Sequence, residues 1–104
     1  MTTSSHVRIA DLVVEMAVDA AFLEALEAED LIHVDRTAEG DLILSPEDAE
    51  RVRVVCTLTR ELEVNLAGAE VILHMRDTMR AMQRQFGDIL DALATELRRR
   101  QPRP

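Results

Sequence analysis

A heptad stripe in the second half of the chain constrains the fold more than any other feature. Its apolar residues are separated by alternating steps of three and four positions: Ile72, Met75, Met79, Met82, Phe86, Ile89 and Leu93. We call these seven residues the seam, because this spacing is typical of the contact line of a coiled coil. Arginine, aspartate and glutamine fill most of the intervening positions, which predicts a solvated surface around the rest of the helix.

The seam predicts one long helix, from 65 to 97, that needs a partner. Asn65 is well suited to cap its N-terminus. A helix of about 32 residues spans roughly 48 Å, which is longer than the other segments of so short a chain can cover. We therefore expect a homodimer formed along the seam, with parallel and antiparallel arrangements both open. Gly87 weakens the helix interior and leaves a bend after Phe86 as an alternative.

Charge is divided unevenly along the chain. Residues 1–50 carry thirteen carboxylates and two arginines, a net charge of −11, whereas residues 51–104 carry seven carboxylates and ten arginines, a net charge of +3. The acidic half should repel nucleic acid and attract a basic protein surface. Two phenylalanines, with no Trp or Tyr, also leave little aromatic surface for stacking on bases.

The sequence favours a cytoplasmic, soluble protein. The lone Cys56 cannot form an internal disulfide, and no apolar run is long enough for a membrane helix or a leader. The basic segment 98–104 ends in prolines, and we expect it to be flexible, with its cations favouring the helix C-terminus.

Two short helices are predicted before the middle of the chain. Apolar residues at i, i+3, i+4 and i+7 from Ile9 to Met16 predict a first helix that ends near Ala17. Asp19 is a suitable N-cap for a second helix that reaches Asp30, where aspartate tolerates the left-handed conformation of a helix end. Two helices joined by a tight turn form a helix-turn-helix.

A wing and a third helix follow. Two β-prone runs, 31–34 and 42–44, flank a polar loop that contains Gly40, which predicts a two-stranded hairpin. Ser45 can cap a third helix with Pro46 in its first turn. This helix should reach about Glu63, with an inner face made of Val52, Val55, Cys56, Thr59 and Leu62.

The predicted fold is an all-α dominated winged helix-turn-helix with a short two-stranded wing and a long C-terminal coiled-coil helix. Its predicted parts are an N-terminus (1–6), the winged helix-turn-helix domain (7–64), the dimerisation helix (65–97) and the basic tail (98–104). We expect the polar N-terminus to be disordered, with partial recruitment as a strand as the alternative.

No motif points to catalysis, a metal or a cofactor. A Cys–His nucleophile from Cys56 and His33 is formally open, but Cys56 falls on the inner face of the third helix, where a thiol is unreactive. The thioethers of Met75, Met79 and Met82 have heptad spacing, which favours packing over soft-metal binding. The sequence contains no Gly-rich phosphate loop and no zinc-ligand spacing.

Several motifs together resemble those of the MerR superfamily, and more closely its small subgroup of chaperone modulators, CbpM. They lie within residues 7–82: EDLI at 29–32, RT at 36–37 with Gly40, LSPED at 44–48, and ELEVNLAGAEVIL at 61–73. The sharpest is the NLAG at 65–68, which is similar to the start of the long helix in CbpM proteins and in the heat-shock repressor HspR.

The resemblance implies one of two functions, and the second helix favours one of them. DNA-binding relatives dock this helix in the major groove and carry an arginine and an aromatic pair on it, where this chain has Glu24, Ala25 and Leu26. CbpM proteins bind the J-domain of a DnaJ-like co-chaperone and restrain its work with a DnaK-type chaperone. We expect such a J-domain to contact an acidic surface made of Asp19, Glu24, Glu27, Glu29 and Asp30.

Two alternatives remain open from the sequence. The first is an HspR-like transcription regulator that binds DNA through Arg36 on the wing and Arg51 and Arg53 on the third helix. The second is an interaction subunit that pairs through its long helix with an unrelated protein.

Overall fold

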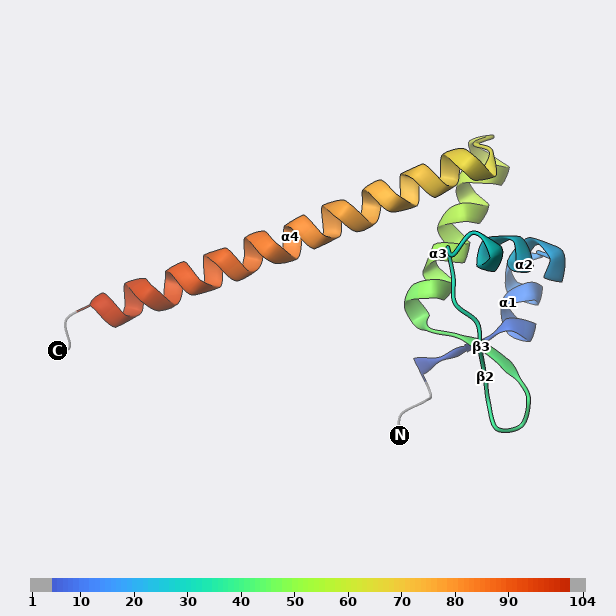
Figure 1. Cartoon of the computed structure of the whole chain (residues 1–104), viewed down its shortest axis with the longest axis horizontal. Helices are drawn as coiled ribbons and strands as arrows, with labels where there is room; N and C mark the ends of the chain where they lie inside the picture. The colour runs from blue at the N-terminus through green and yellow to red at the C-terminus, as the bar shows by residue number, and fades with distance from the viewer. Residues whose placement is uncertain (1–4, 102–104) are drawn as a thin grey trace. The chain divides into compact units, whose positions relative to one another are not determined.

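The computed structural model describes residues 5–101 and divides the chain into two compact units, with the boundary in the sequence between Glu70 and Val71. The elements are β1 (Val7–Arg8), α1 (Ile9–Met16), α2 (Ala20–Ala28), β2 (Asp35–Arg36), β3 (Leu42–Leu44), α3 (Pro46–Cys56), a π-helical turn η2 (Thr57–Glu61) and α4 (Leu66–Arg100) (Figure 1). A helix-dominated chain with a small sheet and a long last helix confirms the predicted fold class.

Three helices begin at the N-cap residues that the sequence predicts. Asp19 Oδ1 accepts the Phe22 N–H at 2.9 Å, Ser45 Oγ accepts the Asp48 N–H at 3.1 Å, and Asn65 Oδ1 accepts the Gly68 N–H at 2.8 Å. Each side chain bonds an amide of the first turn that has no partner within the helix. The cap residues therefore fix where α2, α3 and α4 begin.

The sheet is antiparallel and has three strands in the order β1-β3-β2. Val7 pairs with Leu44 on one side of the central strand, and Arg36 pairs with Leu42 on the other. The predicted two-stranded wing was incomplete, because β1 joins the sheet immediately before α1 begins. We use the name wing for residues 35–44, which comprise β2, β3 and the loop between them.

The predicted strand at 31–34 was wrong, because other groups bond its backbone. Glu27 Oε2 accepts the Val34 N–H at 3.3 Å, Asp48 Oδ2 accepts the His33 N–H at 2.9 Å, and Arg51 Nε donates to the Leu31 carbonyl at 2.6 Å. Leu31 and Ile32 are buried. Because these backbone groups are already hydrogen-bonded outside the sheet, strand pairing begins only at Asp35.

The core of the first unit lies among α1, α2, α3 and the sheet, which gather around it in Figure 1. Its buried apolar side chains are Leu12, Val18, Leu23, Leu26, Leu31, Ile32, Leu44, Ala49, Val52, Val55, Cys56 and Ala69. Leu and Val dominate this core, as expected for a chain with two aromatic residues.

The third helix was predicted too long. Its α-helical part ends at Cys56, and the Leu62 N–H bonds to the Thr57 carbonyl, five residues back. The wider π turn changes the direction in which later side chains point, and Leu62 is 62% exposed rather than on the inner face. Thr59 is half-buried, and its hydroxyl donates to the Val55 carbonyl at 2.9 Å.

Helix α4 continues without interruption through Gly87 and ends three residues beyond Leu97. The long helix therefore includes Arg98, Arg99 and Arg100, which were predicted to lie beyond its end. Glu96 pairs with Arg99 at 3.2 Å and with Arg100 at 2.9 Å. Residues 1–4 of the predicted disordered N-terminus and 102–104 of the tail lie outside the described residues. Within residues 5–101, no helix is both long and apolar enough to cross a membrane.

Candidate partner-binding site on helix α2

The acidic surface predicted from the sequence is exposed in the structure. Asp19 caps α2, Glu24 and Glu27 lie within it, Glu29 is its C-cap, and Asp30 follows in the left-handed conformation with φ of 60°. All five residues are exposed. Across residues 5–101, none of their carboxylates forms an ion pair with an arginine. Their charge therefore remains available to a partner.

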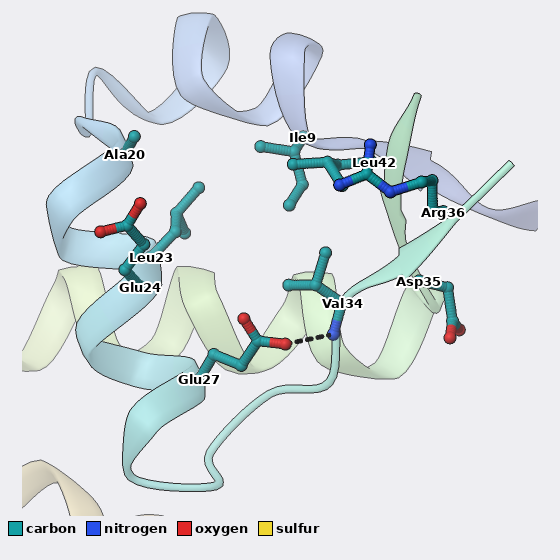
Figure 2. Close-up of a pocket in the computed structure, with 9 residues that line it drawn as sticks. All are labelled: Ile9, Ala20, Leu23, Glu24, Glu27, Val34, Asp35, Arg36 and Leu42. Atoms are coloured by element: carbon teal, nitrogen blue, oxygen red, sulfur yellow. Dashed lines mark hydrogen bonds between the residues drawn. The ribbon is translucent and has the colours of Figure 1, made fainter. Parts of the chain in front are cut away.

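Beside this surface lies a groove between α2 and the wing, with a volume of about 320 Å³. Its lining residues are Ile9, Ala20, Leu23, Glu24, Glu27, Val34, Asp35, Arg36 and Leu42 (Figure 2). Aliphatic side chains from α1, α2 and the wing supply its floor, and charged side chains supply its rim. The groove can therefore offer both an apolar contact and a negative edge to one ligand.

One hydrogen bond joins the two walls of the groove, and two further contacts lie within the wall formed by residues 33–40. Figure 2 shows Glu27 reaching from α2 to the backbone of Val34, where Oε2 accepts the N–H at 3.3 Å. Asp35 Oδ1 lies 3.1 Å from Nε2 of His33, and Arg36 Nη1 donates to the Gly40 carbonyl at 3.1 Å. The Glu27 contact ties α2 to Val34, the residue immediately before the wing, and the Arg36 contact holds that cation to the turn of the wing.

The structure brings together only part of the predicted site. Glu24 and Glu27 line the groove, whereas Asp19, Glu29 and Asp30 do not. Sequence reasoning missed the wing side of the groove, because residues 34–42 approach α2 only through the tertiary fold. No signal in the sequence marks this side, because Leu42 lies in an ordinary β-prone run and its 39% exposure follows only from the fold.

The arginines that DNA binding would use are engaged within the chain. Arg51 Nε donates to the Leu31 carbonyl at 2.6 Å, and Arg53 lies 3.2 Å from Glu15 and 3.7 Å from Glu50. The hydrogen bond with Glu15 raises the pKa of the Arg53 guanidinium above its usual value. Arg36 likewise donates to the Gly40 carbonyl, so each of these three cations has an acceptor within the chain.

The formal Cys–His pair is not assembled as a reactive site. Cys56 is buried in α3, where burial raises the pKa of the thiol, although Arg60 partly opposes this. His33 is exposed and lies beside Asp35 instead. Within the described part of the chain, His, Cys, Asp and Glu side chains form no cluster of three that could hold a metal ion.

The seam lies exposed along α4. Ile72 is the least exposed of its residues at 38%, and Phe86 the most exposed at 62%. The described chain thus leaves this apolar stripe uncovered. Large exposed apolar patches on soluble proteins usually mark an interface.

Two helices joined by a tight turn, a third helix and a wing define a winged helix-turn-helix protein, here with a long helix after it. A family model described as MerR HTH family regulatory protein matches residues 7–89. The chain therefore belongs to the MerR helix-turn-helix family of regulatory proteins. A search of curated proteins found no match.

Proposed function

We propose that this chain is a chaperone modulator: it binds the J-domain of a DnaJ-like co-chaperone through the acidic surface and restrains the action of that co-chaperone with a DnaK-type chaperone. It acts as a cytoplasmic homodimer, without catalysis or a cofactor. The observation that carries the proposal is the set of exposed carboxylates on α2 and at its ends, which form no ion pair with an arginine among residues 5–101. The resemblance implies that DNA-binding relatives use this helix to read DNA.

Charge complementarity supports a J-domain as the partner. The resemblance to CbpM implies a partner that presents a basic helix to its DnaK-type chaperone, and α2 offers that helix an acidic counterpart. Opposite potentials accelerate encounter and select the partner, and they add less to affinity itself. Covering the basic helix would also prevent the co-chaperone from contacting its DnaK-type chaperone, which would explain how binding restrains their joint action.

The same charges disfavour DNA. A duplex docked on α2 would bring Glu24 and Glu27 towards phosphates, where like charges repel and no counterion release compensates. Arg36, Arg51 and Arg53 already have acceptors within the chain. We therefore expect no mobility shift of a DNA duplex by the native protein at low salt.

Calorimetric titration of a purified J-domain tests the proposal. Binding should be measurable at low ionic strength and weaker at high ionic strength, because exposed charges are screened. The double variant Glu24→Arg/Glu27→Arg should weaken binding at low salt by about tenfold or more, since it turns attraction into repulsion. Circular dichroism should first establish that this variant keeps its helix content.

A matched control is Glu61→Arg/Glu63→Arg, which changes the net charge equally at exposed positions outside α2 and the groove. This control should retain most of the affinity. Absence of heat at low salt would refute J-domain binding. Equal weakening by both double variants would show a response to net charge alone and would move the contact away from α2.

A further inference from the structure

The groove beside α2 has an apolar floor that charge attraction alone does not require. Leu23 is 4% exposed, Ile9 and Val34 are half-buried, and Leu42 keeps 39% of its surface accessible. Ile9 lies in α1 and Leu23 in α2, whereas Leu42 lies in β3 and Val34 immediately precedes β2. All four side chains face a common space in Figure 2. An aliphatic group placed there would remove apolar surface from water on both partners.

The size of the groove selects a side chain rather than a whole ligand. Its volume of about 320 Å³ is near the lower end of the roughly 300–1,000 Å³ typical of small-molecule sites. Its two walls are tied by the Glu27 to Val34 hydrogen bond, so the space exists before binding. A preformed site of this size suits one or two aliphatic side chains, with little cost of reorganisation.

The rim determines which charges accompany that side chain. Glu24 and Glu27 contribute two carboxylates, and Arg36 contributes one cation that donates to the Gly40 carbonyl. The Asp35 side chain turns away from the groove in Figure 2, towards His33. The rim is therefore net negative. It favours a partner whose aliphatic side chain is flanked by lysine or arginine.

A helix fits this surface better than a strand. The two edges of the sheet are β1 and β2, and each is two residues long, which is too short to template an added strand. An amphipathic helix instead places an apolar anchor and its flanking cations on one face, at spacings of three and four residues.

We propose that the groove binds a basic amphipathic helix of the partner and receives an aliphatic side chain of that helix between Leu23, Val34 and Leu42. The inference rests on the proposed function for the identity of the partner, and it adds an apolar anchor to the acidic surface. Leu42 is a specificity-determining residue in this arrangement.

Calorimetry with the J-domain compares two truncations of exposed aliphatic residues. Leu42→Ala removes part of the floor, while Val14→Ala removes the same kind of surface at a residue that is 81% exposed on α1 and does not line the groove. Leu42→Ala should weaken binding about tenfold at both low and high salt, because apolar contacts are not screened. Val14→Ala should leave it unchanged, and Leu42→Met should restore it.

A second experiment does not depend on the J-domain. The probe is a synthetic basic helical peptide with leucines along one face, compared with a peptide of equal charge that has serines in their place. The leucine peptide should shift the NMR methyl signals of Leu42, Val34 and Ile9, and bind at least about fivefold more tightly than the serine peptide.

The outcomes separate the two proposals. If the J-domain binds and Leu42→Ala matches Val14→Ala, the groove inference is overturned and the proposed function stands. If the J-domain does not bind but the leucine peptide shifts the groove methyls selectively, the proposed function fails and the groove inference stands. Equal binding of the two peptides, without groove shifts, overturns the groove inference.

Discussion

Ala17 ends α1 in the left-handed conformation, with φ of 54° and ψ of 45°, which alanine seldom adopts. Arg60 supports this turn from η2, since its guanidinium donates to the carbonyls of Met16 and Ala17 at 2.6 Å each. These two bonds satisfy carbonyl groups at the helix end that have no partner within α1. The cation also interacts favourably with the C-terminal end of the helix dipole.

Replacing Ala17 with glycine should stabilise the first unit by about 0.5–1 kcal/mol, because glycine has no Cβ to strain a positive φ. Urea unfolding followed by circular dichroism measures the change. Ala21→Gly is the matched control at an exposed helical position in α2, and it should destabilise by a similar amount. A loss of stability in Ala17→Gly would mean that this strain is not what limits the turn.

Cys56 should be protected from thiol reagents in the folded chain. Burial raises the pKa of the thiol above its usual value of 9.0 and keeps the reactive thiolate scarce. At pH 8, modification by iodoacetamide should be at least about tenfold slower in the native protein than in guanidinium. Equal rates in the two states would place Cys56 on an accessible surface.

The same raised pKa has a defined effect on stability. The folded chain holds the proton more tightly than the unfolded chain, so the contribution is complete below the usual thiol pKa of 9.0 and is lost as pH rises through the folded pKa. Unfolding free energy should therefore fall above about pH 9 in the native protein, and fall less in Cys56→Ala.

At the scale of the elements, helix ends were predictable because their chemistry is local. Asp19, Ser45 and Asn65 each bond an amide three residues ahead, so the sequence contains both partners of the contact. Asp30 likewise takes the left-handed conformation that the position after a helix demands. At Gly68 an added Cβ would lie 2.8 Å from Cγ1 of Val64, so glycine allows close packing in the first turn of α4.

The start of β2 was not predictable, because the groups that displace strand pairing are distant in sequence. Arg51 bonds Leu31 across twenty positions, and Asp48 bonds His33 across fifteen. The run at 31–34 has the apolar composition of a strand, but Leu31 and Ile32 contribute to the core without sheet hydrogen bonds. The apolar composition of this segment therefore reflects burial in the core and not pairing as a strand.

Only the α2 side of the groove was predictable from the sequence, because the residues of its other side are distant in sequence from α2. Glu24 and Glu27 lie on one predicted helix, and their charge suggested a partner surface from the sequence alone. Val34 and Leu42 approach that helix only once the wing has folded, and no periodicity links them to it. Local patterns thus predict the acidic half of the site, and only tertiary structure adds its apolar half.

Across the whole molecule, the first fifty residues carry a net charge of −11, and the described ion pairs neutralise little of it. Such a field attracts a cationic partner over distances of about one Debye length, roughly 8 Å at physiological salt. The later residues are net positive, so attraction is directed to the acidic part of the chain.

The seam on α4 favours self-association, independently of the acidic surface. Within the 35 residues of helix α4, the seam runs from Ile72 to Leu93, about 32 Å at 1.5 Å per residue, and its side chains are exposed along that length. Water around so long an apolar stripe is unfavourable, and a second seam of equal spacing is its natural cover. Gly87 lies within an unbroken helix and needs no bend for the stripe to remain continuous.

Met82→Asp should therefore convert the protein from dimer to monomer, because it buries a carboxylate in the middle of the seam without a partner. Light scattering coupled to size exclusion should show half the native mass, and circular dichroism should show less helix. Ala81→Asp introduces the same charge one position away from the seam, at an exposed site, and should keep the native mass. A native protein that is already monomeric at micromolar concentration, or a Met82→Asp variant that stays dimeric, would contradict assembly along the seam.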